Sequence, residues 1–117
     1  MSNAQKIRVN GCEFAVRFRK GWGAEFGWNP NILTFGTGMP EGRFVADFIH
    51  EIGEMACDVL NFRWQISDAH SMSSSSYLFV LTHEQFDEIA SIIGLAIHHD
   101  LPKIRKAWRE AKRRFNP

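Results

Sequence analysis

The sequence predicts an α+β domain in which a small N-terminal antiparallel β-sheet packs against two or three α-helices. Residues 1–38 contain short apolar segments with the alternation of strands, whereas the apolar residues after about position 43 recur at helical spacing. The strand-like segments come first and the long helical segments follow, which is the order of an α+β domain. With 117 residues the chain is long enough for one domain with one core.

The first segment, residues 6–20, predicts a β-hairpin or two short strands. Asn10-Gly11 is the favoured residue pair for a type I′ turn. Three apolar residues then occupy every second position, as in a strand with one buried face: Phe14, Val16 and Phe18. Residues 21–31 are rich in Gly, Asn and Pro and are typical of a loop, and residues 32–38 predict a short strand that ends at glycines.

The longest predicted helix covers residues 43–62. Its apolar residues follow helical spacing: Val45, Phe48, Ile49, Ile52, Met55, Ala56, Val59 and Leu60. A polar interruption, "HEIGE", lies in the middle of this apolar pattern. The interruption is either a functional site or simply the solvent-exposed face of the helix.

Two further helices are predicted, at residues 82–99 and 102–115. Thr82 and Gln85 form a capping box that predicts a helix beginning at His83, and Pro102 suits the first turn of the last helix. The Ser-rich residues 67–76 predict a loop, which is either a lid over a site or a plain linker. Residues 77–81 fit a strand or an apolar lead-in to the next helix.

Composition excludes several classes of protein. No run approaches 18 apolar residues, so we expect no membrane span. The first residues lack the apolar region of a secretory signal, so we expect a cytoplasmic protein. The two cysteines, Cys12 and Cys57, do not make a disulfide framework, and we expect buried free thiols.

Charge is unevenly distributed along the chain. Residues 1–100 hold 7 Lys/Arg and 12 Asp/Glu, whereas residues 101–117 hold 7 Lys/Arg and 1 Glu. A basic amphipathic helix of this kind can bind nucleic acid, an acidic membrane or an acidic partner. It can also dock on the domain through Ile104, Trp108 and Ala111 with its cations in solvent, and we favour this second interpretation.

The interruption contains a spacing that suits a metal site. His50 and Glu54 are four residues apart, so their side chains lie on one face of the helix, one turn apart. The pattern H-E-x-x-E resembles the zinc motif H-E-x-x-H, in which the Glu beside the first ligand is the general base. Glu51 holds that position, and a set of two His and one Glu is an accepted zinc ligand set.

A third ligand is expected from later in the chain. His83 is the first choice because capping fixes the start of its helix, and His70 in the Ser-rich loop is the rival. His98 and His99 lie roughly four turns from His83 and are not expected to share its site. Three protein ligands leave a position for a water whose pKa zinc lowers to about 7.

The alternative without a functional role is that His50, Glu51 and Glu54 belong to the solvated face of the helix, because charged pairs at this spacing are common. The apolar neighbours Phe48, Ile49 and Ile52 indicate a partly buried His50, which needs a partner. A metal is one such partner, and a plain His–Glu hydrogen bond is another.

Two segments, "FIHEIGEMACDVLNF" and "LTHEQFDEIASIIGLAIHHDL", together with "GWNPNILTFGTG", resemble a family of small phage- and prophage-encoded zincin-like metallopeptidases. The resemblance covers roughly residues 27–101 and rests on short motifs. It implies a minimal zincin-like fold, with His50, Glu54 and His83 as metal ligands and Glu51 as general base. Two stretches depart from the family pattern, "EMACD" and the connector "RWQISDAHSMSSSSYLF".

The sequence therefore predicts a zinc-dependent hydrolase, most simply a metallopeptidase, with an extended peptide pairing against the strand at 32–36. Two alternatives stay open. One is a non-enzymatic binding module whose basic C-terminal helix engages nucleic acid or an acidic partner. The other is a zincin-like scaffold in which the metal is only structural.

Overall fold

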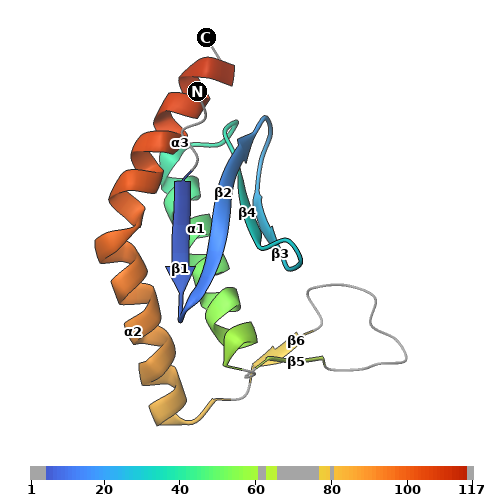
Figure 1. The fold of residues 1–117 in the computed structure, drawn as a ribbon, viewed down its shortest axis with the longest axis vertical. Helices are drawn as coiled ribbons and strands as arrows, with labels where there is room; N and C mark the ends of the chain where they lie inside the picture. The colour runs from blue at the N-terminus through green and yellow to red at the C-terminus, as the bar shows by residue number, and fades with distance from the viewer. Residues whose placement is uncertain (1–4, 61–62, 66–76, 80, 116–117) are drawn as a thin grey trace.

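The computed structural model of the chain describes residues 5–60, 63–65, 77–79 and 81–115. A four-stranded sheet is followed by three helices, so the expected α+β fold is confirmed (Figure 1). The strands of this sheet are β1 (Gln5–Val9), β2 (Cys12–Arg19), β3 (Ala24–Gly27) and β4 (Ile32–Gly36). The helices are α1 (Glu41–Val59), α2 (His83–His99) and α3 (Leu101–Phe115), and a short pair, β5 (Arg63–Gln65) with β6 (Tyr77–Phe79), lies between α1 and α2 in sequence.

The sheet is mixed rather than purely antiparallel, which differs from the expectation. The strand order is β1-β2-β4-β3, and β4 pairs with β2 in parallel and with β3 antiparallel. The predicted β1–β2 hairpin is present, with Asn10 and Gly11 at φ values of 49° and 86° in its turn. The parallel pair arises because the chain runs out to form β3 at the sheet edge and then returns between β2 and β3.

The expected loop at residues 21–31 contains this edge strand. Ala24 and Phe26 are partly buried and pack against the core, whereas Glu25 is exposed, which is the alternation of a strand. The pattern covers only four residues and lies among glycines, so turn residues dominate the sequence signal here.

One face of the sheet and the helices form the core. Its strand residues are Ile7, Val9, Phe14, Val16, Leu33 and Phe35, and they meet Phe44, Phe48, Ile52 and Met55 of α1 and Ile104 and Trp108 of α3. Figure 1 shows α1 behind the sheet, with α2 and α3 running along the side of β1. The opposite face of the sheet is solvent-exposed at Lys6, Arg8 and Arg17.

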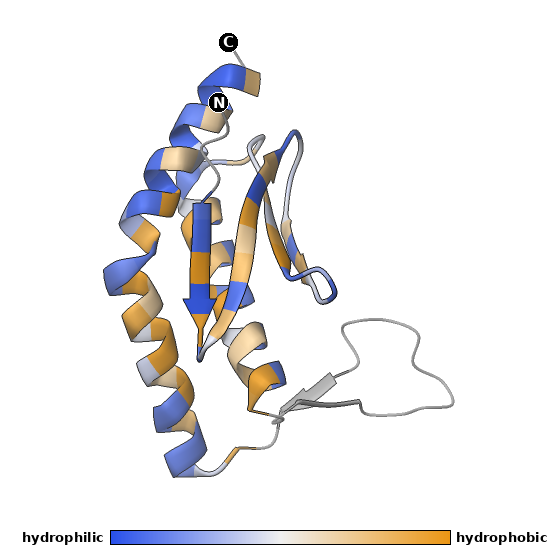
Figure 2. Ribbon diagram, viewed as in Figure 1, coloured by the Kyte–Doolittle hydropathy of each residue, from blue (hydrophilic) through white to orange (hydrophobic). Residues whose placement is uncertain are grey.

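The C-terminal helix docks on the domain, as favoured from the sequence. Ile104, Trp108 and Ala111 are each at most 1% exposed, and the remaining faces of α3 are mostly hydrophilic (Figure 2). The Trp108 indole Nε1 donates a 2.8 Å hydrogen bond to the Gly36 carbonyl, so α3 is attached to the end of β4.

Two further expectations concern the cysteines and membranes. Neither Cys12 nor Cys57 is in a disulfide; Cys57 is buried and Cys12 is half-buried rather than buried as expected. Within the described residues, no helix combines the length and the apolar character needed to cross a bilayer. The Ser-rich segment 67–76, and with it His70, lies outside the described residues.

Candidate metal centre

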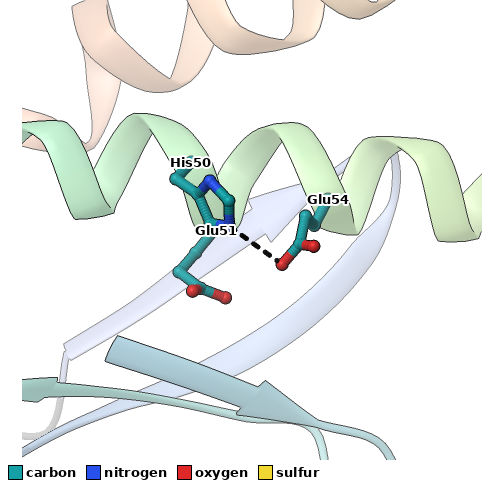
Figure 3. Close-up of side chains that lie close together, drawn as sticks. All are labelled: His50, Glu51 and Glu54. Carbon is teal, nitrogen blue, oxygen red and sulfur yellow. Dashed lines mark ion pairs between the residues drawn. The ribbon is translucent and has the colours of Figure 1, made fainter. Parts of the chain in front are cut away.

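The polar interruption of α1 forms one face of the helix. Asp47, His50, Glu51, Glu54 and Asp58 recur at intervals of three and four residues, so they lie on one stripe along α1. The neighbouring apolar positions point into the core instead, and this fixes the rotation of the helix. The stripe therefore faces the edge strand β3 rather than α2, as Figure 3 shows for its central residues.

The central residues of the stripe lie close together. One ligand atom from each of His50, Glu51 and Glu54 lies within 4.8 Å of the others. The His50 Nε2 atom is 3.3 Å from Glu54 Oε2, as the i,i+4 spacing predicts (Figure 3). The His50 side chain is 66% exposed, Glu54 24%, and residue Glu51 only 6%.

These exposures correct the expectation for the burial of His50. His50 is not partly buried, because Ile49, one of its apolar neighbours, is itself 37% exposed. The buried member is Glu51, which lies deepest on the stripe. His50 thus lies at the surface with Glu51 beneath it, and both line the cleft beside β3.

The three residues line a cleft between α1 and β3. The cleft has a volume of about 490 Å³, and β3 contributes Ala24, Glu25 and Phe26 to its opposite wall. At one end, the Trp28 indole Nε1 donates a 3.3 Å hydrogen bond to Asp58 Oδ2. This contact connects the chain after β3 to the C-terminal half of α1.

The cleft continues toward the start of α1. Gly23, Arg43 and Asp47 line this extension, which also reaches His50 and Glu51. Asp47 is only 7% exposed, and its Oδ1 lies 3.0 Å from Arg43 Nε. Its Oδ2 is buried with no hydrogen-bond partner within the part of the chain that the structure describes.

His83 is not brought to this group. It begins α2 with the predicted capping box, since Gln85 N donates to Thr82 Oγ1 at 3.2 Å. However, its side chain is 85% exposed, and its Nε2 lies 3.5 Å from Asp87 Oδ2 on its own helix. The helices explain the separation, because α2 packs on a different face of α1 from the one that carries His50.

Contacts between the helices show this arrangement. Ile89 clusters with Ala56 and Cys57 near the end of α1, and Ile93 lies against Gly53. His83 is thus placed near the C-terminal end of α1, away from the middle of the stripe. His98 and His99 lie at the other end of α2, with ring centroids 4.8 Å apart, and they are not part of the group either.

The strand that could pair with a peptide also differs from the expectation. The strand at 32–36 is β4, which is paired on both sides. β3 is the edge strand next to the cleft. The sequence signals named the three residues on α1 but missed the opposite wall, because the edge position of β3 depends on pairing between distant segments.

Comparison with known proteins gives no match: no family model matches the sequence, and no curated protein or solved structure is detectably similar to it. The resemblance to phage zincin-like metallopeptidases therefore stays a prediction. The geometry defines the site as a His-Glu-Glu group that can hold a metal ion.

Proposed function

We propose that this protein is a zinc-dependent hydrolase that cleaves peptides, with His50 and Glu54 as metal ligands and Glu51 as general base. One observation carries the proposal: the three side chains gather within 4.8 Å at the wall of a cleft whose other wall is an edge strand. This arrangement combines a possible metal site with a backbone that can hold an extended chain.

The donor set suits zinc. An imidazole nitrogen and a carboxylate oxygen are both common zinc ligands, and catalytic zinc sites keep a position open for water. The high exposure of His50 leaves such a position accessible from the cleft. When bound, zinc would supply a Lewis acid and lower the pKa of a coordinated water.

Glu51 is placed to accept a proton. It is the least exposed member of the group, and it lies beside both proposed ligands. A carboxylate within hydrogen-bond reach of the attacking water can take its proton and later pass it to the leaving amine. Glu54 lies against His50 Nε2, so the pair brings two ligand atoms to the same point.

The edge strand provides the substrate contacts. β3 pairs with β4 on one side and is an edge strand of the described sheet, and its residues Ala24, Glu25 and Phe26 line the cleft. A peptide added there as a further strand would have its backbone held by hydrogen bonds and a carbonyl carried past the His50 group. In this proposal β3 binds the peptide, Glu51 transfers the proton, and His50 and Glu54 hold the metal.

Metal content tests the ligand assignment. Elemental mass spectrometry on protein purified without a metal-affinity tag is expected to give about one zinc per chain. His50→Ala is expected to lose the metal, whereas His98→Ala, an exposed histidine elsewhere, should retain it. Absence of metal after incubation with zinc would overturn the proposal.

The same assay identifies the third ligand. His70→Ala and His83→Ala are compared, because His83 was favoured by the sequence and His70 lies outside the described residues. Loss of zinc in only one variant assigns the ligand. Retention in both means that the group on α1, with water, is sufficient.

Glu51→Gln separates a catalytic metal from a structural one. The amide keeps the size of the side chain but cannot accept the proton, so the variant is expected to bind zinc and lose peptide hydrolysis by at least about 100-fold. The substrate is a quenched fluorescent peptide library. A variant as active as the parent would remove Glu51 from the mechanism.

A further inference from the structure

A second feature lies outside the cleft: the cations are concentrated on two elements that contact each other. Of the 14 Lys and Arg, seven lie on α3 and five on the β1–β2 hairpin and the residue after it; only Arg43 and Arg63 lie elsewhere. These two segments carry just two acidic residues, Glu13 and Glu110. Since α3 packs against β2, the cations lie on adjoining parts of the surface.

Gly36 of β4 is hydrogen-bonded both to the turn after β2 and to α3. The turn that follows β2 lies against residues 36–38. Gly36 N donates to Gly23 O at 2.7 Å, and Gly38 N donates to Gly21 O at 2.8 Å. From the other side, Trp108 of α3 donates to the Gly36 carbonyl. The turn 20–23 and the C-terminal half of α3 are therefore held at the same end of the molecule (Figure 1).

Lys112 reinforces this junction. Its Nζ donates to the Thr37 and Met39 carbonyls at 3.1 and 2.7 Å and lies 5.0 Å from the centroid of the Trp108 ring. Arg109 is likewise engaged, because it pairs with Glu41. Lys20, Arg113 and Arg114 are exposed at this end, and the structure gives them no acidic partner among the described residues.

A large aromatic side chain, Trp22, lies at the same end of the molecule. Trp22 is 60% exposed, although it is in the middle of the turn that is hydrogen-bonded to residues 36–38. The Arg19 guanidinium lies under this turn, 3.4 Å from the place that a side chain on Gly21 would occupy, and its Nη1 donates to the Lys20 carbonyl at 3.1 Å. The backbone of the turn is thus held in place while the indole faces solvent.

We propose that this end of the molecule binds single-stranded nucleic acid, with Trp22 stacking on a base and Lys20, Arg113 and Arg114 contacting phosphates. Proteins that bind single strands combine a basic surface with aromatic side chains on which bases stack. A duplex does not offer an unstacked base to Trp22. The proposed contacts use none of the residues of the His50–Glu51–Glu54 group, so nucleic-acid binding can be tested separately from the proposed hydrolase activity.

Fluorescence anisotropy with a labelled oligothymidylate and a labelled oligouridylate, each of about 20 nucleotides, tests the proposal. Neutralising three or four phosphates is expected to give a slope of log binding constant against log salt of about −2 to −3. Trp22→Ala is expected to weaken binding roughly 5- to 100-fold. The preferred strand tells whether the ligand is DNA or RNA.

Matched controls are available in the chain. Phe86→Ala removes an aromatic of 61% exposure from α2 and should leave the affinity unchanged. Arg113→Glu with Arg114→Glu should weaken binding at least about ten-fold. Lys103→Glu with Lys106→Glu makes the same charge change at the other end of α3 and should have a clearly smaller effect.

Several results would overturn the proposal. They are an unchanged affinity in Trp22→Ala, an equal loss in the two double variants, or a duplex bound as tightly as the single strand. Binding to anionic lipid vesicles in place of the oligonucleotides would also overturn it. Circular dichroism of each variant verifies that the loss is not one of folding.

Discussion

At Gly36 the backbone leaves no space for a side chain. A Cβ atom there would lie 2.3 Å from the Gly21 carbonyl oxygen, which is a backbone atom and cannot rotate away. Gly36→Ala is therefore expected to lower the free energy of unfolding by about 1–3 kcal/mol through overpacking. Urea denaturation followed by circular dichroism measures the change.

Gly94 is the matched control for Gly36. It lies in α2 with nothing within 4 Å of the position of an added Cβ. Gly94→Ala should raise the free energy of unfolding by about 1 kcal/mol, because alanine is the better helix former. Equal effects of the two substitutions would contradict the close approach at Gly36.

The Glu41–Arg109 pair makes stability depend on pH. The hydrogen bond from Arg109 holds the pKa of Glu41 below its ordinary value of 4.5, and the same contact raises the pKa of Arg109. Because the folded pKa of Glu41 is the lower one, the contribution of the pair is present above pH 4.5 and is lost as the pH falls through the lowered pKa.

Glu41→Gln reports this contribution. The difference in free energy of unfolding between the parent and Glu41→Gln is expected to be largest near neutral pH and to shrink as the pH falls below 4.5 and through the lowered pKa of Glu41. Urea titrations at several pH values provide the measurement. A difference that grows as the pH falls would mean that the carboxylate is not the stabilised form.

Residue-level signals in the sequence predicted those parts of the site that depend on local geometry. The spacing of His50 and Glu54 on one helix face, and the capping box at Thr82, are both present. The third ligand could not be predicted in the same way. It depends on how two helices pack, and α2 packs with His83 away from the group.

At the scale of elements, the buried hydrogen bond of Trp108 adds to the apolar packing and to the Lys112 and Arg109 contacts that hold α3 on the domain. Trp108 is 1% exposed and stacks against Phe44 with a centroid distance of 4.8 Å. Trp108→Phe keeps an aromatic ring but leaves the Gly36 carbonyl without this donor. We expect a loss of about 1–3 kcal/mol in the free energy of unfolding, measured in urea.

Trp28→Phe is the comparison at the surface. Trp28 is 41% exposed, and its hydrogen bond to Asp58 is open to water. Water can replace the lost donor, so the cost is expected to stay below about 1 kcal/mol. If the two substitutions cost the same, burial of the Trp108 contact would not be what makes it important.

Elements differ in how far the sequence predicts them. The helices and the β1–β2 hairpin follow from periodicity, capping and the Asn-Gly turn, which are short-range signals. The edge strand β3 and the parallel β2–β4 pair were missed. The β2–β4 pair joins segments that are separated in the sequence by turn-forming residues, so no local pattern predicts it. β3 has only four residues, and its alternation is too short to be recognised among the neighbouring glycines.

At the scale of the whole molecule, a metal in the cleft would bind and stabilise the folded state, because His50, Glu51 and Glu54 are brought together only when α1 is formed. A zinc concentration of about 100 times the dissociation constant would then stabilise the fold by about 2.7 kcal/mol, or roughly 10 °C in Tm. Thermal melts with zinc and with a chelator measure this shift. His50→Ala should melt at the same temperature in both conditions.

The molecule separates two kinds of charge over its surface. The carboxylates of α1 line the cleft, whereas most cations lie on the β1–β2 hairpin and α3. The two proposed activities can consequently be removed one at a time. Glu51→Gln should leave oligonucleotide binding unchanged, and Trp22→Ala should leave zinc binding unchanged.

The attachment of α3 to β4 also affects how the chain folds during its synthesis. Trp108 follows Gly36 by 72 positions, which a ribosome synthesising 5–20 residues per second takes roughly 4 to 14 seconds to add. During that interval the nascent sheet has its strands but not the indole that completes the end of β4, and Phe44 lacks its stacking partner. Until α3 emerges, this part of the growing chain exposes apolar surface to chaperones and to other chains.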